Sequence, residues 1–421
     1  MTDFAPIVFV HGNGDTAALW LTTLWRFESN GWPRERLHAL DMPCPLARDD
    51  DAAPQPGRSS TADALRCLAD EVARVRALHG AAQVILVANS RGGFAVRNFV
   101  AHGGAAQVSH AILGGTPNHG VWADPGFRPG NEFNGAGPFL AGLNANGETP
   151  PGPRWMTLRS DANDKYAQPD GLWIGAPGTP TGVDAASPEL RGAHNVVIAG
   201  IDHRETSFSP AAFEATWRFI TGQSPATLQI EPEAQVLLDG TVSGLHAQAA
   251  VPDNLPLAGA TVEVFATDPA TGERAGPARH RRGVGADGRW GPFATDSRTP
   301  LEFVISAPDH ATTHIYRSAF LRSSSLVHLR ASRLADVDAE TVALVQLSRP
   351  RGYFGVPRDR ILLDGQVPAE LPAGVAGVSL ATARVLDRAE RAVSGEFNGE
   401  HITGRAWPCA GNHAVLLELH F

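Results

Sequence analysis

The sequence has few cysteines, no long apolar run and no excess of positive charge. Its three cysteines, Cys44, Cys67 and Cys409, are scattered and odd in number, so they form no disulfide framework and show no metal-binding spacing. No stretch approaches the roughly 18 consecutive apolar residues that a membrane-spanning helix needs. A net charge of −9 disfavours nucleic acid or an anionic membrane surface as a partner. We therefore expect a soluble globular protein without an integral membrane segment.

The start of the sequence shows no pattern that predicts an export signal. Residues 2–6 contain no basic segment, and the apolar stretch Ile7–Val10 has only the length of a strand. We expect a protein that is cytoplasmic as the sequence stands, and secretion after removal of a signal is the alternative.

A strand-to-helix reversal carries the most specific pattern in the sequence. Val84–Ala88 is an apolar run typical of a buried parallel strand, and apolar residues at helical spacing follow over Phe94–Val100. Such a reversal places one residue at its apex, here Ser90, in the arrangement called a nucleophile elbow. The usual pattern is Gly-x-Ser-x-Gly, and Ala88 replaces the first glycine with another small residue. Ser90 is therefore a candidate nucleophile, and an ordinary helix N-cap is the alternative.

The turn after the first strand offers backbone N–H groups. The strand Ile7–Val10 runs into the polar, glycine-containing turn His11–Asp15. In open α/β sheets, ligands bind beyond the carboxyl ends of the strands. Enzymes with a nucleophile elbow take one oxyanion donor from this turn and the other from the residue after the nucleophile. The candidate donors are the backbone N–H groups of Asn13 and Arg91, and a plain turn is the alternative.

Two later strands precede residues suited to acid–base chemistry. Trp155–Leu158 is a predicted strand, and the polar loop after it contains Asp164. Val196–Ile201 is a further predicted strand, and His203 follows it almost directly. The chain order Ser90, Asp164, His203 is the order nucleophile, acid and base that accompanies this elbow in α/β folds.

Other residues compete for the acid and base roles. The competing acids and bases are Asp161, Asp202, His119 and His194. The chain has sixteen histidines, so only their positions relative to the predicted strands can distinguish a candidate base. His203 is favoured because it follows the last predicted strand of the α/β region. Asp164 is favoured because residues 166–169 can fold back beneath it.

The spacing of apolar residues predicts three domains. Residues 1–223 alternate short apolar strands with amphipathic helices, which predicts a parallel sheet with helices on both faces. Residues 226–334 contain short alternating strands between Gly, Pro and Asp turns, as in a β-sandwich. Residues 335–421 predict a second β-rich domain, sandwich-like or barrel-like. No catalytic spacing appears after residue 225, and the β-domains could support a homodimer.

Residues 116–153 form a long connection rich in glycine, proline and asparagine. A connection of this length inside a compact α/β domain is usually functional, which predicts a lid or the wall of a substrate cleft. The apolar residues that could form this wall are Trp122, Phe127, Phe133, Phe139 and Leu140. A surface insertion is the alternative.

The order of several short motifs resembles that of bacterial and archaeal α/β-hydrolase lipases. The motifs in the α/β region are His11–Asn13, Gly115–Gly120 and Leu143–Pro150. The wider layout is similar to that of the Archaeoglobus long-chain lipases, which carry C-terminal β-domains. The segments that carry this resemblance are Arg26–Gly31, Phe219–Gly222 and Ile315–Phe320. The resemblance implies that Ser90 is the nucleophile and His203 the base. It implies that Asn13 and Arg91 supply the oxyanion donors.

One departure from these lipases concerns the acid. The archaeal relatives take it just after the strand that follows the elbow, where this chain has Gly114 and Gly115. The acid must then come from the loop Ser160–Asp164.

We expect a serine hydrolase that cleaves carboxylic esters of small molecules or lipids through a Ser-His-Asp triad and an acyl-enzyme. The chemistry needs no metal and no organic cofactor. Two alternatives remain open. The same triad could act on a polyester, a lactone or an amide, or the protein could bind a lipid or polymer without catalysis.

Overall fold

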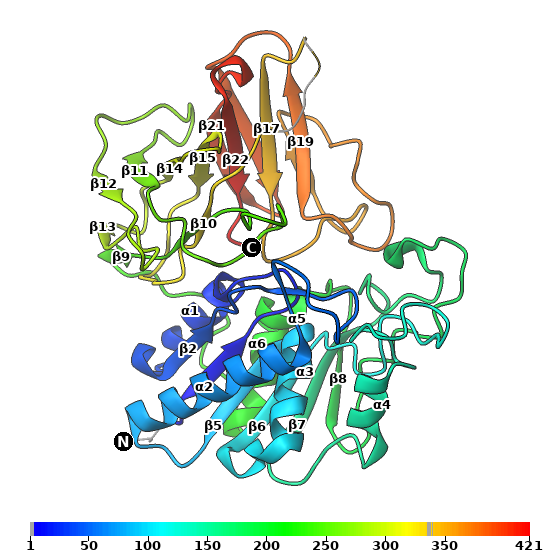
Figure 1. Ribbon diagram of the computed structural model, residues 1–421. Helices are drawn as coiled ribbons and strands as arrows, with labels where there is room; N and C mark the ends of the chain where they lie inside the picture. The colour runs from blue at the N-terminus through cyan, green and yellow to red at the C-terminus, as the bar shows by residue number, and fades with distance from the viewer. Residues whose placement is uncertain (1–3, 335–337, 339) are drawn as a thin grey trace. The chain divides into compact units, whose positions relative to one another are not determined.

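The computed structural model describes residues 4–334, 338 and 340–421, and the chain divides into two compact units (Figure 1). Unit 1 consists of residues 1–230 together with residues 246–254. Unit 2 consists of residues 231–245 and 255–421.

Unit 1 is built on a six-stranded parallel sheet with the order β2-β1-β5-β6-β7-β8. Its strands are β1 (Ile7–Val10), β2 (Leu37–Leu40), β5 (Val84–Asn89), β6 (Val108–Gly114), β7 (Arg154–Ser160) and β8 (His194–Ile198). The central strands β1 and β5 are buried along their whole length. They are apolar because both faces of a parallel sheet are covered, so neither set of alternating side chains reaches water.

Helices cover the two faces of this sheet in unit 1 (Figure 1). The α-helices of unit 1 are α1 (Leu21–Ser29), α2 (Thr61–His79), α3 (Arg91–Phe99), α4 (Pro138–Ala145), α5 (Glu205–Phe208) and α6 (Pro210–Thr221). Because side chains alternate along a strand, Val8 and Val10 pack with α2 and α3, whereas Ile7 and Phe9 pack with α1 and α6. None of the helices in the described residues has the length and apolar character needed to cross a bilayer.

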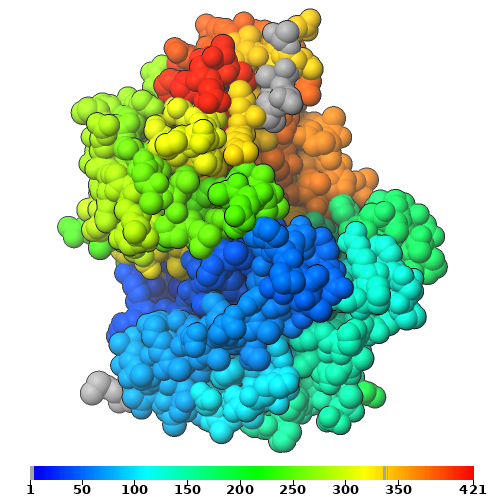
Figure 2. Space-filling model, viewed as in Figure 1, coloured from blue at the N-terminus to red at the C-terminus, as the bar shows by residue number. Residues whose placement is uncertain are grey.

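Helix α2 shows how local sequence sets an element of this layer. Ser60 and Asp63 form a capping box at its start, and Gly80 ends it in the left-handed conformation. One face buries Leu68, Val72 and other apolar residues against the sheet. The opposite face is exposed and forms the light-blue surface in Figure 2.

The regular secondary structure of the described part of unit 2 consists of strands, apart from one short 3-10 helix (Cys409–Gly411). Its largest sheet is mixed, with seven strands in the order β12-β11-β14-β15-β22-β17-β19. These strands are β11 (Thr261–Ala266), β12 (His280–Gly283), β14 (Leu301–Ser306), β15 (Thr312–Arg317), β17 (Ala343–Ser348), β19 (Leu380–Val385) and β22 (His413–Glu418). The smaller sheets contain β9 (Val236–Leu238), β10 (Val242–Ser243), β13 (Phe293–Thr295), β16 (Leu329–Arg330), β18 (Ile361–Leu363), β20 (Ala392–Phe397) and β21 (Glu400–Arg405).

The expected fold class is confirmed, since a parallel sheet with helices on both faces is followed by a β-rich region. Strands β15 and β22 pair in parallel, so one sheet of unit 2 takes strands from both sides of residue 335. The expected boundary itself falls at residues 335–337, which lie outside the described residues. The division into domains 1–223, 226–334 and 335–421 therefore stays a prediction.

Candidate active site

Ser90 occupies a strained position between β5 and α3. Its φ of 53° and ψ of −125° lie in a region that residues other than glycine rarely adopt. The side chain is buried and makes no capping hydrogen bond to α3. A Cβ atom at Gly92 would lie 2.5 Å from the carbonyl oxygen of Val10, and one at Gly93 would lie 2.0 Å from Oγ1 of Thr116. Glycine at position 92 therefore lets α3 approach β1 this closely, and glycine at position 93 leaves room for the side chain of Thr116.

His203 and Asp164 are in direct contact in the interior of unit 1. Nδ1 of His203 lies 2.8 Å from Oδ2 of Asp164, and both side chains are buried. The other carboxylate oxygen of Asp164 accepts the N–H of Tyr166, whose ring lies edge-on to the imidazole at 4.6 Å. Because a carboxylate only accepts, Nδ1 carries the proton and Nε2 is left as an acceptor. Nε2 is buried and has no hydrogen-bond partner among the described residues.

The competing acids bind backbone N–H groups. Asp161 accepts from the N–H groups of Ala162 and Gly200, and its pKa is lowered, chiefly by the bond from Ala162. Asp202 accepts from two N–H groups at the start of α5. Both carboxylates therefore stabilise turns around the loops that carry Asp164 and His203.

The competing histidines have other surroundings. Nδ1 of His119 lies 2.7 Å from the carbonyl oxygen of Ser187, and its Nε2 lies 3.3 Å from Glu148. His194 begins β8, is exposed and stacks on the ring of Phe219. Because His194 begins its strand, it lies at the amino end of the parallel sheet, whereas Ser90 lies at the carboxyl end.

The two candidate oxyanion donors belong to two chain segments that approach Ser90. Asn13 belongs to the turn after β1, and a Cβ atom at its neighbour Gly12 would lie 2.9 Å from the Cβ of Ser90. Arg91 begins α3 directly after the serine. Within the described part of the chain, neither backbone N–H donates a hydrogen bond. The assignment of these two groups as oxyanion donors stays a prediction.

His11 holds the turn after β1 from within the core. The ring is fully buried, Nδ1 lies 2.9 Å from the carbonyl oxygen of Gly12, and Nε2 accepts the N–H of Met42 at 3.0 Å. Burial lowers the pKa of His11, although nearby Asp41 and Asp15 act in the opposite direction. The neutral ring therefore carries its proton on Nδ1 and fixes the start of the turn.

Two polar residues near the elbow were not singled out from the sequence. Asn89 ends the otherwise apolar strand β5, and Nδ2 lies within 3.3 Å of oxygen atoms of Gly114, His203 and Thr206. A single polar residue at the end of an apolar strand is a pattern that could have revealed it. Glu132, which pairs with Arg91, lies in the long connection 116–153, where no periodic pattern marks it.

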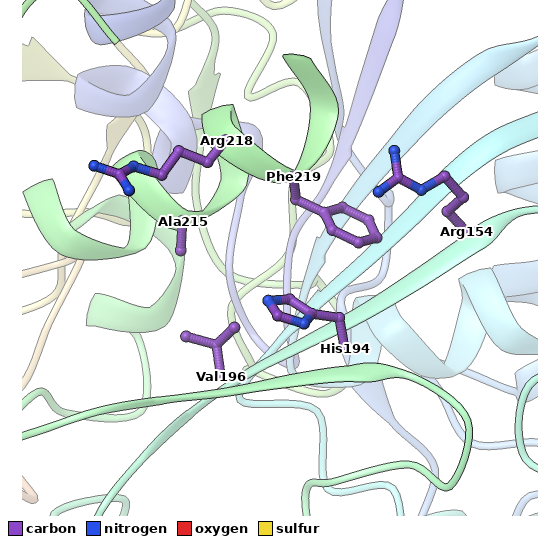
Figure 3. Close-up of a pocket in the computed structure, with 6 residues that line it drawn as sticks. All are labelled: Arg154, His194, Val196, Ala215, Arg218 and Phe219. Carbon is purple, nitrogen blue, oxygen red and sulfur yellow. The ribbon is translucent and has the colours of Figure 1, made fainter. Parts of the chain in front are cut away.

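A hollow elsewhere on unit 1 does not belong to this site. Figure 3 shows the residues that line it, Arg154, His194, Val196, Ala215, Arg218 and Phe219. The guanidinium of Arg154 lies over the ring of Phe219, with 4.7 Å to the ring centre. Arg154 and His194 begin β7 and β8, whereas Ser90 follows the carboxyl end of β5. In a parallel sheet these are opposite edges, so the hollow is remote from the elbow.

Comparison with known proteins finds a family match within the β-rich region. Residues 234–334 match the family described as the lipase C-terminal domain. No curated protein matches the chain. The match lies within the β-rich region, and the parallel sheet of unit 1 with its strand-to-helix turn at Ser90 has the arrangement of an α/β-hydrolase fold.

Several solved structures are similar at low sequence identity. The propeptide form of the lipase BlEst2 from Bacillus licheniformis is 15% identical in sequence. The match spans 96% of this chain and 93% of the BlEst2 chain, with a TM-score of 0.38. The phospholipase PlaB from Legionella pneumophila is 12% identical over 80% of this chain and 96% of that chain, with a TM-score of 0.36. The carboxylesterase CesB from Bacillus subtilis is 14% identical over 53% of this chain and 86% of that chain, with a TM-score of 0.31. The likeness of layout to the Archaeoglobus lipases stays a prediction.

Proposed function

We propose that the protein hydrolyses carboxylic esters with Ser90 as nucleophile, His203 as base and Asp164 as the acid that orients the base. The observation that carries this proposal is the buried 2.8 Å contact between Asp164 and Nδ1 of His203, which leaves Nε2 as an unpartnered acceptor. The strained, uncapped Ser90 supports it, because such backbone strain concentrates at functional sites.

In the first half of the reaction, Ser90 Oγ attacks the ester carbonyl while Nε2 of His203 takes the hydroxyl proton. The carbonyl oxygen becomes an oxyanion, and the backbone N–H groups of Asn13 and Arg91 donate to it. Each such donor is typically worth about 3 kcal/mol of transition-state stabilisation. Asp164 stabilises the imidazolium. Collapse of the oxyanion breaks the bond between the acyl carbon and the ester oxygen, which takes the proton from Nε2 and departs as the alcohol, and an acyl-enzyme on Ser90 remains.

In the second half, water replaces the alcohol. Nε2 of His203 takes a proton from the water, whose oxygen attacks the acyl carbon and forms a second oxyanion held by the same two N–H groups. Collapse of this intermediate breaks the bond to Ser90 Oγ, and the imidazolium returns the proton to that oxygen. The products are a carboxylic acid and the free serine.

A covalent probe tests the nucleophile directly. We expect a fluorophosphonate to label the wild-type protein and not Ser90→Ala, and we expect Ser90→Ala to lose at least about 10³-fold in turnover of p-nitrophenyl butyrate. Ser209→Ala is the matched control, because Ser209 is an N-cap whose side chain accepts the N–H of Ala212. That variant should lose about 1 kcal/mol of stability and keep its label. Equal labelling of wild type and Ser90→Ala would overturn the proposal.

The substrate class follows from a panel measured on the same proteins. Ester turnover that disappears in His203→Ala separates an enzyme from a protein that only binds lipid or polymer. Rates on acyl chains of increasing length, on a lactone, on an anilide and on a polyester film then rank the bonds that the triad cleaves. We expect the p-nitrophenyl acyl esters to be cleaved fastest, and a preference for the anilide would contradict the assignment to esters.

A further inference from the structure

The side chain of Arg91 is buried directly behind the elbow, and all of its donors are used. Nε and Nη2 donate to the two carboxylate oxygens of Glu132 at 2.6 and 2.8 Å. Nη1 donates to Ser59 Oγ at 2.8 Å and to the carbonyl oxygen of Pro45 at 3.2 Å, and Nη2 also donates to the carbonyl oxygen of Ser59. Each of Arg91 and Glu132 is only 2% exposed. A guanidinium held in this fork geometry has one orientation.

The side chain of Asn13 forms a hydrogen bond to the segment Pro45–Ala47, which also accepts a hydrogen bond from Arg91. Its Oδ1 accepts the N–H of Ala47 at 2.7 Å. The next residue, Gly14, donates its N–H to the carbonyl oxygen of Pro45 at 3.1 Å. The short strands β3 (Leu46–Ala47) and β4 (Arg58–Ser59) pair with each other, with Ala47 opposite Ser59. The β3–β4 ribbon therefore holds the side chains of both candidate oxyanion residues.

We propose that Arg91 and Asn13 position their own backbone N–H groups through side chains anchored on the β3–β4 ribbon, and that Glu132 is a positioning residue that locks Arg91. This inference rests on the proposed ester hydrolysis and adds the device that sets its oxyanion site. A backbone N–H group stabilises an oxyanion only when it lies within hydrogen-bond distance of the position that the oxyanion takes in the transition state. Small displacements of either residue therefore reduce the stabilisation of the transition state.

The ion pair with Arg91 also indicates a structural role for the residues around Glu132 in the connection 116–153. If this part of the connection moved away, it would leave a buried guanidinium without its carboxylate, which is strongly unfavourable. The ion pair therefore holds the residues around Glu132 against the start of α3.

The test uses Glu132→Gln, which keeps the shape of the side chain and removes its charge. We expect kcat on p-nitrophenyl butyrate to fall about 10- to 100-fold with KM changed less than about threefold, because only the transition state is affected. The affinity for an alkyl boronic acid, which forms a tetrahedral adduct with serine, should fall in parallel. Glu214→Gln is the control, since Glu214 pairs with Arg218 on the surface of α6, and it should match the wild type.

A second variant keeps the test decisive if Glu132→Gln folds poorly. Arg91→Met combined with Glu132→Met replaces the buried ion pair by apolar side chains, a change that proteins often tolerate in stability. We expect this folded double variant to show the same loss of kcat and of boronic acid affinity. If either folded variant keeps both quantities within about threefold of the wild type while Ser90→Ala is inactive, the positioning role is wrong and the proposed hydrolysis stands. If Ser90→Ala remains active, both fall.

Discussion

Nδ2 of Asn89 lies 3.3 Å from the carbonyl oxygen of His203, which is 114 residues further along the chain. The residue before the candidate nucleophile is thus joined to the backbone of the candidate base. The same nitrogen lies 3.1 Å from Oγ1 of Thr206, which donates to that carbonyl at 2.7 Å. Because β5 and the loop before α5 share this contact, the distance between Ser90 and the imidazole is set by side chains as well as by the sheet.

Replacing Asn89 by alanine should weaken both stability and catalysis. The change removes a buried donor, which typically costs about 1 to 3 kcal/mol in the free energy of unfolding, and it releases the loop that carries His203. We expect kcat to fall about tenfold beyond any effect of unfolding, since a misplaced base loses orientation. Asn195→Ala is the control, because Asn195 bonds Thr157 and Leu190 away from Ser90. Equal kcat values for the two variants would contradict the prediction.

Asparagine substitutions should separate the candidate acids. Asp164→Asn keeps the size of the side chain and removes the charge that faces Nδ1 of His203. We expect kcat to fall roughly 10³- to 10⁴-fold, because the imidazole then adopts the wrong tautomer and its charged form loses its partner. Asp161→Asn should stay within about threefold of the wild type, since Asp161 binds backbone N–H groups. The reverse order of effects in ester turnover would reassign the acid.

The buried ring of His11 should make stability fall in acid. Burial holds its pKa below the ordinary value, so the unfolded chain binds this proton more readily than the folded one. The free energy of unfolding therefore rises with pH through this group: its contribution is complete above about pH 6.5, the unfolded value, and is lost as the pH falls below it.

Urea unfolding at pH 5, 6, 7 and 8 measures this dependence. We expect a smaller change in unfolding free energy between pH 5 and pH 7 for His11→Gln than for the wild type. His194→Gln, which changes an exposed histidine of the same unit, should keep the slope of the wild type. Parallel curves for wild type and His11→Gln would show that the ring does not titrate with folding.

Two glycine substitutions should have opposite signs. A Cβ atom at Gly92 would lie 2.5 Å from the carbonyl oxygen of Val10 and 2.7 Å from that of His11, and backbone atoms cannot move away cheaply. We expect the free energy of unfolding of Gly92→Ala to fall by about 1 to 3 kcal/mol or more, and we expect this variant to lose most of its ester turnover. Gly142 lies in α4 with open space around the added atom, so Gly142→Ala should gain about 0.5 to 1 kcal/mol. Thermal unfolding of the two variants measures both signs, and a stabilised Gly92→Ala would refute the close approach.

Much of unit 1 could be predicted from local pattern. Short apolar runs separated by amphipathic helices specify a covered parallel sheet, because each face must bury its own set of alternating side chains. The apex position of Ser90 follows from the length of strand β5 and the start of helix α3, both of which are local properties. The same holds for α2, whose capping box and terminal glycine mark its two ends.

The contacts that would make a site out of these elements depend on tertiary structure. Asp164 and Asp161 lie in one loop and have the same chemistry, and only the packing of that loop against His203 places one carboxylate at the imidazole and the other on backbone N–H groups. The pairing of Arg91 with Glu132 is equally remote from any pattern, since it joins a helix start to an irregular connection. Periodicity in a sequence reports which side of an element is buried. It carries no information on which distant side chain fills the space opposite, and that choice is made only when the whole core closes.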